Sequence, residues 1–257
     1  MKKKIAKQVK VSLVNSKGDT FRMTLQRPGY IEDMIHKHGS WEPHLSDFLS
    51  KFISDGSVFL DIGANIGYHS LYLASLYSNA TVMSFEPHPK IYQQLSRNVE
   101  INKFKNVLVY NKAVGDTKGS VDFYMQDIFN YNRGLSCINY DSSIGNKIKK
   151  IKVDIVALDE FLNEDIKKKV RVLKIDTQGY EYHVLQGALN LLQKSQPVIA
   201  FELHHNTGPQ LEDILKLIPN YNVYKIEPWS GEVRKVKEPD PPNFANDYIC
   251  VPHTLDV

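Results

Sequence analysis

Short apolar runs alternate along the chain with longer segments in which apolar residues recur every three or four positions. The short runs are typical of buried strands and the longer segments of amphipathic helices. Strands are expected at 58–62, 81–85, 107–110, 170–175, 197–201, 221–226 and 248–251, and helices at 68–77, 91–99, 184–192 and 211–218. Because parallel strands need crossover connections, this alternation predicts an α/β fold with helices on both faces of a mainly parallel, doubly wound sheet.

A small cap is expected ahead of this alternation. Residues 10–15 and 20–25 have the pattern of two strands around a polar turn, which predicts a hairpin. Ser40 is placed to cap a helix with Pro43 in its first turn. We therefore divide the chain into a hairpin and helical cap, residues 1–54, and a main domain, residues 55–257.

A less regular part follows the third strand of the main domain. Residues 121–125 and 151–156 are expected to pair as strands, with the polar segment 127–147 between them. A stretch of that length without periodicity is usually a functional lid or a mobile segment. We expect it to lie over the strand ends.

Composition narrows the class of protein only moderately. The formal net charge of +3 is mild and the lysines fall in short groups, so nucleic-acid binding is not indicated. Cys137 and Cys250 are far apart and form no C-x-x-C pair, so neither a disulfide framework nor a zinc site is implied. Lys7 and Lys10 interrupt the N-terminal apolar residues before they reach signal-peptide length, and no other run is long enough to span a bilayer. We expect a cytoplasmic protein.

The first strand of the main domain runs into a glycine loop, Asp61-Ile62-Gly63-Ala64-Asn65-Ile66-Gly67. Gly63 and Gly67 permit positive φ and close approach to a ligand, and Asn65 tolerates the left-handed region. The following helix would point its first amide groups into the same crevice. The dinucleotide pattern G-x-G-x-x-G has glycine where this loop has Asn65 and Tyr68, so a pyrophosphate would fit poorly. The loop predicts a nucleotide-like ligand without phosphate.

Acidic residues stand at the ends of four predicted strands: Asp61, Glu86, Asp176 and Glu202. Ligands of α/β sheets bind at the carboxyl ends of the strands, so these acids are expected to share one site. Glu86 lies roughly 20 residues after the glycine loop, the spacing at which an acid meets ribose hydroxyls in nucleotide-binding domains. Ala113 would border an adenine and Asp116 would accept from its amino group, although an ordinary turn explains this segment equally well.

Further motifs accompany the loop in a fixed order over roughly residues 55–205. They are Phe85-Glu86-Pro87, Leu158-Asp159-Glu160-Phe161-Leu162, Lys174-Ile175-Asp176-Thr177-Gln178-Gly179-Tyr180-Glu181, Val184-Leu185-Gln186-Gly187-Ala188 and Phe201-Glu202-Leu203-His204. Together they closely resemble the FkbM family of S-adenosylmethionine-dependent methyltransferases. The loop alone is common to class I methyltransferases, and the block from Asp176 to Glu181 is the specific part.

This resemblance implies a Rossmann-like class I methyltransferase fold with a seven-stranded sheet, and S-adenosyl-L-methionine as the cofactor. Asp61, Gly63, Asn65 and Gly67 would surround the methionine part of the cofactor, and Glu86 its ribose. The resemblance implies O-methylation of a hydroxyl on a sugar, glycan or secondary metabolite, without naming the acceptor.

Three residues are candidates for catalysis. Asp176 would orient the acceptor hydroxyl or take its proton, or else cap the following turn. His204 would act as a general base, would join Asp176 and Glu202 in holding a divalent ion, or would be a hydrogen-bonded structural histidine. We assign no metal.

Acceptor contacts are expected from less regular segments. Glu181 is a candidate for substrate binding, although an acid at a helix start also satisfies free amides there. Tyr131 and Arg133, in the segment over the strand ends, and Trp229, in a later loop, are candidates to contact the acceptor.

Other functions stay open at the level of sequence. A nicotinamide-dependent oxidoreductase would share the sheet and the ribose acid, but the missing glycines argue against it. A nucleic-acid methyltransferase usually has an Asn/Asp-Pro-Pro-aromatic block where this chain has Asp176-Thr177-Gln178-Gly179. A noncatalytic module that only binds the cofactor is the third alternative, and the oligomeric state is open.

Overall fold

The computed structural model describes residues 7–126, 131–138, 148–203, 209–226, 230–236 and 246–255. The strands are β1 (Lys7–Val14), β2 (Thr20–Arg27), β3 (Val58–Ile62), β4 (Thr81–Phe85), β5 (Val107–Tyr110), β6 (Ala113–Val114), β7 (Gly119–Gln126), β8 (Ile148–Val156), β9 (Val170–Ile175), β10 (Val198–Leu203), β11 (Tyr221–Ile226), β12 (Val233–Lys235) and β13 (Asn246–Pro252). The helices are α1 (Tyr30–His38), α2 (Pro43–Ser50), α3 (Tyr68–Leu76), α4 (Pro89–Asn102), the 3-10 turn η1 (Arg133–Leu135), α5 (Leu158–Phe161), α6 (Glu164–Lys169), α7 (Glu181–Gln186), α8 (Leu189–Ser195) and α9 (Leu211–Leu217). No helix in these ranges is long and apolar enough to cross a membrane.

The main sheet has the strand order β12-β11-β13-β10-β9-β3-β4-β5. Strands β10, β9, β3, β4 and β5 run parallel, whereas β13 is antiparallel to both of its neighbours. All seven strands predicted from the apolar runs belong to this sheet, and the short β12 adds an eighth at its edge. The predicted α/β fold with a mainly parallel, doubly wound sheet is confirmed.

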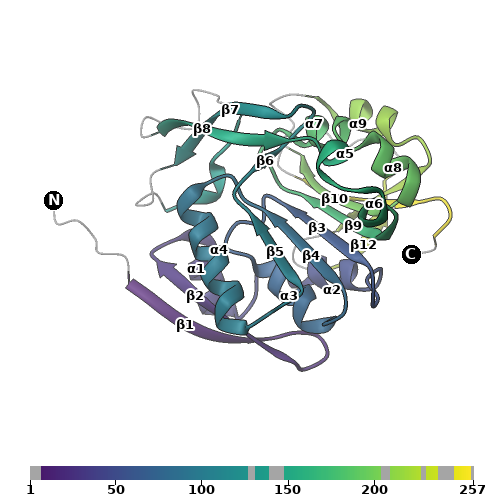
Figure 1. Cartoon of the computed structure of the whole chain (residues 1–257). Coiled ribbons are helices and arrows are strands. Elements are labelled where there is room, and N and C mark those ends of the chain that lie inside the picture. The colour runs from purple at the N-terminus through teal and green to yellow at the C-terminus, as the bar shows by residue number, and fades with distance from the viewer. Residues whose placement is uncertain are drawn as a thin grey trace.

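Helices cover the two faces of this sheet and create two apolar clusters (Figure 1). Strand β3 shows how alternate residues divide between them. Phe59 packs with α2, α3 and α4 on one face, whereas Leu60 and Ile62 pack with α5, α7, α8 and α9 on the other. Because strand side chains alternate, Asp61 points toward the same face as Phe59. This orientation decides what Asp61 contacts.

The N-terminal hairpin is present as β1 and β2, which pair antiparallel. Figure 1 shows it beside α1, α3 and α4, and its apolar residues Phe21, Met23 and Leu25 belong to the same cluster as Phe59. Residues before 55 therefore share a core with the main sheet. The division at residue 54 stays a prediction.

Several helices differ from the expectations. Helix α1 was not predicted, and α2 begins at Pro43 with Glu42, not Ser40, as the residue before it. The predicted helix at 184–192 is broken into α7 and α8 at Gly187, where a Cβ would lie 1.9 Å from the carbonyl oxygen of Gly115. Close backbone packing, which apolar periodicity does not reveal, places this break.

The predicted pair of strands after β5 is confirmed. Strands β7 and β8 pair antiparallel, and β8 also pairs with β6 to make a small three-stranded sheet. Between β7 and β8 the structure describes residues 131–138, which include η1. The carbonyl of Tyr131 accepts a hydrogen bond from the amide of Tyr30, 2.7 Å away, so this segment is tied to α1.

Candidate active site

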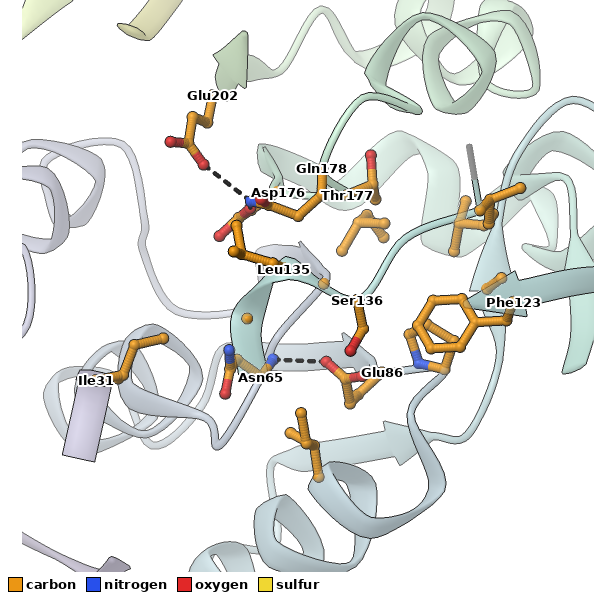
Figure 2. A pocket seen from close by; sticks show the side chains of 18 of the residues that line it. Ile31, Asn65, Glu86, Phe123, Leu135, Ser136, Asp176, Thr177, Gln178 and Glu202 are labelled. Atoms are coloured by element: carbon orange, nitrogen blue, oxygen red, sulfur yellow. Dashed lines mark hydrogen bonds between the residues drawn. The ribbon is translucent and has the colours of Figure 1, made fainter. Parts of the chain in front are cut away.

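A cavity of about 280 Å³ lies at the carboxyl ends of β3, β4 and β9 (Figure 2). We call it the inner cavity. Its lining includes Gly63 and Asn65 from the glycine loop, Glu86 after β4, and Asp176 after β9. These predicted site residues come from three separate strands, and the sheet brings them to one edge as expected.

The glycine loop has the backbone that its sequence predicts. Gly63 and Gly67 have φ of 76° and 91°, and Asn65 takes the left-handed region with φ of 50°. A Cβ on Gly63 would meet the Asp176 carbonyl, and one on Gly67 would lie 2.4 Å from Cδ1 of Leu95. Gly67 does not line the cavity. Packing within the protein requires a glycine at both positions, and Gly63 also lines the cavity.

Glu86 is held firmly at the cavity wall. Its two carboxylate oxygens accept from the amides of Asn65, at 2.9 Å, and His88, at 2.8 Å, as Figure 2 shows for Asn65. Burial raises the pKa of Glu86 to about 7, although the two amides oppose this shift. A carboxylate oxygen accepts more than one hydrogen bond, so both oxygens keep capacity toward the cavity. This arrangement suits a vicinal diol.

Apolar side chains line the part of the cavity formed by the small sheet. Ala113 and Val114 of β6, Phe123 of β7, and Ile138 lie on its wall. They form a slot for a flat, apolar-faced group such as adenine. Asp116 does not line the cavity, because its carboxylate bonds to Nδ1 of His183, 2.9 Å away. The contact of Asp116 with adenine stays a prediction.

Asp61 also differs from the expectation. It is fully buried and does not line the inner cavity. Its carboxylate accepts a short hydrogen bond from Ser70 of α3 and lies 4.0 Å from the ammonium of Lys174. Because the side chain points toward the face covered by α3, Asp61 ties β3 to α3 and β9 instead of forming the wall of the site.

Asp176 and Glu202 line the cavity together at its other end. The side-chain amide of Gln178 donates to both carboxylates, at 2.8 Å to Asp176 and 3.0 Å to Glu202, and Figure 2 shows the second of these bonds. Lys174 lies 3.6 Å from Asp176. Burial alone would lower the pKa of Lys174, but the carboxylates of Asp176, Asp61 and Glu42 raise it above its ordinary value. Lys174 therefore stays cationic beneath the acids.

Glu181 does not line the inner cavity, and its role in substrate binding stays a prediction. The side chain is buried and accepts from the amides of Thr177 and Gly179 and from the hydroxyl of Thr177. It organises the loop from 176 to 180, the alternative that an acid at a helix start allows. Its effect on the site is to fix the backbone of that loop, including Asp176.

Other predicted residues lie at the margin or outside the described part. The Tyr131 side chain is exposed and packs edge to face against Tyr30, with ring centroids 6.0 Å apart, and it does not line the inner cavity. The backbone of Arg133 belongs to η1, but its side chain lies outside the described residues, as do His204 and Trp229. Their roles stay predictions.

Sequence reasoning missed Trp41 and Glu42, which line the inner cavity from the segment between α1 and α2. Glu42 has φ of 45° and ψ of 54°, a left-handed conformation that is strained for a residue with a Cβ. Burial raises its pKa to about 8; Lys174 opposes this, and Asp176, Glu202 and Asp61 reinforce it. Both residues lie in the segment Gly39-Ser40-Trp41-Glu42-Pro43, where no periodicity placed their side chains at the site.

Residues 61–226 match the family model described as the methyltransferase FkbM domain. This match spans more than half of the chain. The chain belongs to the FkbM methyltransferase family. This family uses S-adenosylmethionine, so the resemblance seen in the sequence motifs is confirmed. A nicotinamide oxidoreductase is thereby disfavoured.

Individual relatives are distant. The chain is 27% identical to Methyltransferase 1 of Beauveria bassiana, over 52% of this chain and 59% of that protein. It is 26% identical to hexuronic acid methyltransferase AglP of Haloferax volcanii, over 64% of this chain and 62% of that protein. The match thus spans about three fifths of these relatives. A crystal structure of methyltransferase FkbM from Methylobacillus flagellatus superposes with a TM-score of 0.50 at 17% identity, over 77% of this chain and 44% of that one, which supports the fold.

The inner cavity fits the cofactor that this family uses. Glu86 presents two anchored carboxylate oxygens suited to the ribose diol, and the slot of Ala113, Val114 and Phe123 suits the adenine. Asn65 and Gly63 line the same cavity as Glu86 and Asp176. Within the described ranges, no group of three or more His, Cys, Asp or Glu is arranged to hold a metal ion.

Proposed function

We propose that this protein transfers the methyl group of S-adenosylmethionine to a hydroxyl of a sugar, a glycan or a secondary metabolite. The observation that carries the proposal is the inner cavity with an anchored acid at one end and a bridged pair of acids at the other. Glu86 suits the ribose, and Asp176 with Glu202 suits an acceptor hydroxyl. The name of the relative AglP, a hexuronic acid methyltransferase, supports a sugar acceptor.

The cofactor supplies a methyl group on a positively charged sulfur, which is an activated leaving group. The chain's own residues then have to bind, align and deprotonate the acceptor. Carboxylates accept hydrogen bonds from hydroxyl groups, so Asp176 and Glu202 would orient the acceptor oxygen. Gln178 holds the two carboxylates together, and Lys174 offsets their charge. The short 3-10 turn η1 lies over the cavity and would limit the access of water (Figure 2).

The test is a transfer assay with isotopically labelled methyl. The purified protein is incubated with labelled S-adenosylmethionine and separate pools of neutral sugars, uronic acids, glycans, small alcohols and RNA. The proposal expects label on a hydroxyl oxygen, located by mass spectrometry of the product, and loss of transfer in Asp176→Asn. Label on RNA alone would favour a nucleic-acid methyltransferase, and cofactor binding without transfer to any pool would favour a noncatalytic module.

We also propose a location in the cytoplasm. Cys137 and Cys250 are both buried free thiols, as is usual in a reducing compartment. Fractionation of the source cells with an antibody to the protein tests this, and recovery in an extracellular fraction would contradict it.

A further inference from the structure

A second cavity, of about 430 Å³, opens beside the inner one. We call it the outer cleft. It is formed by α1, the segment between α1 and α2, the first turn of α2, and residues of β10, β11 and β13. Tyr30, Trp41, Glu42 and Glu202 line both cavities. A molecule in the outer cleft would therefore meet the inner cavity across these four side chains.

The walls of the outer cleft combine aromatic rings with carboxyl groups. Tyr30 and Trp41 pack edge to face, with centroids 5.8 Å apart. Glu42, Glu202 and Asp247 supply the acids, and none of the described lining residues is a lysine or an arginine. Aromatic faces bind the apolar side of a ring and carboxyl groups exchange hydrogen bonds with its hydroxyls, whereas an acidic ligand would find no lysine or arginine among these residues to pair with. The chemistry favours an uncharged polyhydroxy ligand.

We propose that the outer cleft is the acceptor site and that it binds an uncharged polyol such as a neutral sugar; this inference rests on the proposed function. Glu42 receives the proton of the hydroxyl that is methylated. Glu42 takes this proton as the acceptor oxygen gains the methyl group. The carbon–sulfur bond breaks and its electron pair stays on sulfur, so the sulfur loses its positive charge. Glu42 then returns the proton to water through the outer cleft.

His69 can form a hydrogen bond with Glu42 whether the Glu42 carboxyl is ionised or protonated. Nε2 of His69 lies 3.2 Å from Oε2 of Glu42, and Nδ1 of His69 lies 2.9 Å from the hydroxyl of Ser46. A neutral imidazole has one donor and one acceptor nitrogen, and a hydroxyl can both donate and accept. His69 therefore donates to an ionised Glu42 in one tautomer and accepts from a protonated Glu42 in the other. Gain or loss of the proton breaks no hydrogen bond.

The electrostatic setting supports this exchange. Burial lowers the pKa of His69 to about 3, so its ring is neutral near neutral pH. The pKa of Glu42, raised to about 8, lies near the pH at which a base is most effective. The charged groups that face it are Asp61 of β3, Lys174 of β9, Asp176, Glu202 of β10 and Asp247 of β13. Burial also raises the pKa of Asp247, with Glu42 and Glu202 adding to the shift.

The backbone at Glu42 fixes the carboxyl in place. Its carbonyl accepts from the amides of Leu45 and Ser46 at 3.1 and 3.2 Å, and Pro43 follows directly. These bonds hold a left-handed conformation that the residue would otherwise avoid. Glu42 is a strained residue that lines both cavities, whereas Asp176 does not line the outer cleft, and this is the geometric reason to place the proton acceptor on Glu42.

The first test reads the protonation of Glu42 without any turnover. The protein is labelled with ¹³C at the glutamate carboxyl carbon, and its spectrum is followed as the pH is raised. We expect one glutamate signal with a midpoint near pH 8 that is missing in Glu42→Gln and present in Glu100→Gln, a matched change on the exposed surface of α4. A Glu42 signal that titrates near its ordinary value of 4.5 would overturn the assignment of the base.

The second test reads acceptor binding. Protein loaded with S-adenosylhomocysteine is applied to an array of neutral and uronate glycans as wild type, Trp41→Ala, Trp41→Phe and Glu100→Gln. We expect binding to neutral glycans that falls at least tenfold in Trp41→Ala and is largely kept in the other two. Binding to uronate glycans only, binding unaffected by Trp41→Ala, or binding to no glycan would each overturn the acceptor site. Calorimetry with S-adenosylhomocysteine distinguishes failure of this inference from failure of the proposed function. If the wild-type protein binds S-adenosylhomocysteine but fails either test, only the inference is overturned.

Discussion

The carbonyl oxygen of Asp176 fills the space that a side chain on Gly63 would need, 1.9 Å from the ideal Cβ position. The glycine loop and the loop that carries Asp176 are thus packed backbone to backbone. Asp176 also donates its amide to the carbonyl of Ile62, 2.9 Å away. The glycine loop predicted to bind the cofactor and the residue predicted to orient the acceptor are therefore in direct backbone contact.

Gly63→Ala is expected to damage both folding and cofactor binding. Positive φ costs an alanine about 1–2 kcal/mol, and the clash with Asp176 adds to it. Gly56 is a matched control, because its φ of 78° is close to the 76° of Gly63 while no atom lies within 4 Å of its Cβ position. Chemical denaturation should show a modest loss of stability for Gly56→Ala with S-adenosylhomocysteine binding kept, and a larger loss for Gly63→Ala with binding abolished. Equal effects would contradict the packing argument.

Glu86→Gln is expected to lower the affinity for S-adenosylhomocysteine about 10- to 100-fold, because a hydrogen bond to a charged acceptor contributes about 1.5–3 kcal/mol. The variant keeps the shape of the side chain but loses an acceptor and its charge. Isothermal titration measures the change, with the exposed Glu100→Gln as the control. A change of less than threefold would remove Glu86 from the ribose site.

Binding should also depend on pH through the same residue. Burial raises the pKa of Glu86 to about 7, so the carboxylate form declines as the pH falls below that value. We expect the affinity for S-adenosylhomocysteine to decrease from about pH 8 to pH 6 in the wild type and to change little in Glu86→Gln. Parallel pH profiles for the two proteins would show that another group governs binding.

Gln178→Glu is expected to reduce methyl transfer by about tenfold or more while leaving cofactor affinity within a few-fold. The change replaces the amide that donates to Asp176 and Glu202 by a third carboxylate, so the pair loses its bridge and gains repulsion. Gln93→Glu, on the exposed side of α4, is the matched control. Transfer rates and binding constants from the same preparations check the prediction, and unimpaired transfer in Gln178→Glu would contradict it.

Glu42→Gln is expected to gain stability over the wild type as the pH rises. The pKa of Glu42 is about 8 in the folded protein against an ordinary 4.5, so the folded state binds its proton more tightly than the unfolded chain. The stability that comes from this proton is full below about pH 4.5 and is lost as the pH rises through about 8. Glutamine does not ionise, so the melting temperature of the variant should exceed that of the wild type by more at pH 9 than at pH 5. A difference that stays constant over this range would refute the raised pKa.

The sequence predicted the sheet well because strands buried on both faces leave continuous apolar runs. It placed Gly63, Asn65, Glu86, Asp176 and Glu202 on one cavity because parallel strands end at one edge. It did not show which way a polar side chain points. Asp61 faces α3 because it alternates with Leu60 and Ile62, and Glu181 turns back to its own loop.

The outer cleft was beyond sequence reasoning for a related reason. Trp41 and Glu42 lie in a connection without periodicity, and α1, which supports them, was not predicted. Tertiary packing places His69 between Glu42 and Ser46. Such contacts join segments far apart along the chain, so no local pattern reveals them.

Calorimetric titration of the wild-type protein with S-adenosylhomocysteine tests the central claim most directly, with NAD titrated in parallel. The inner cavity, with Glu86 anchored by Asn65 and His88, predicts saturable binding of about one molecule per chain and no heat from NAD. A folded protein that binds NAD, or neither ligand, would contradict the account.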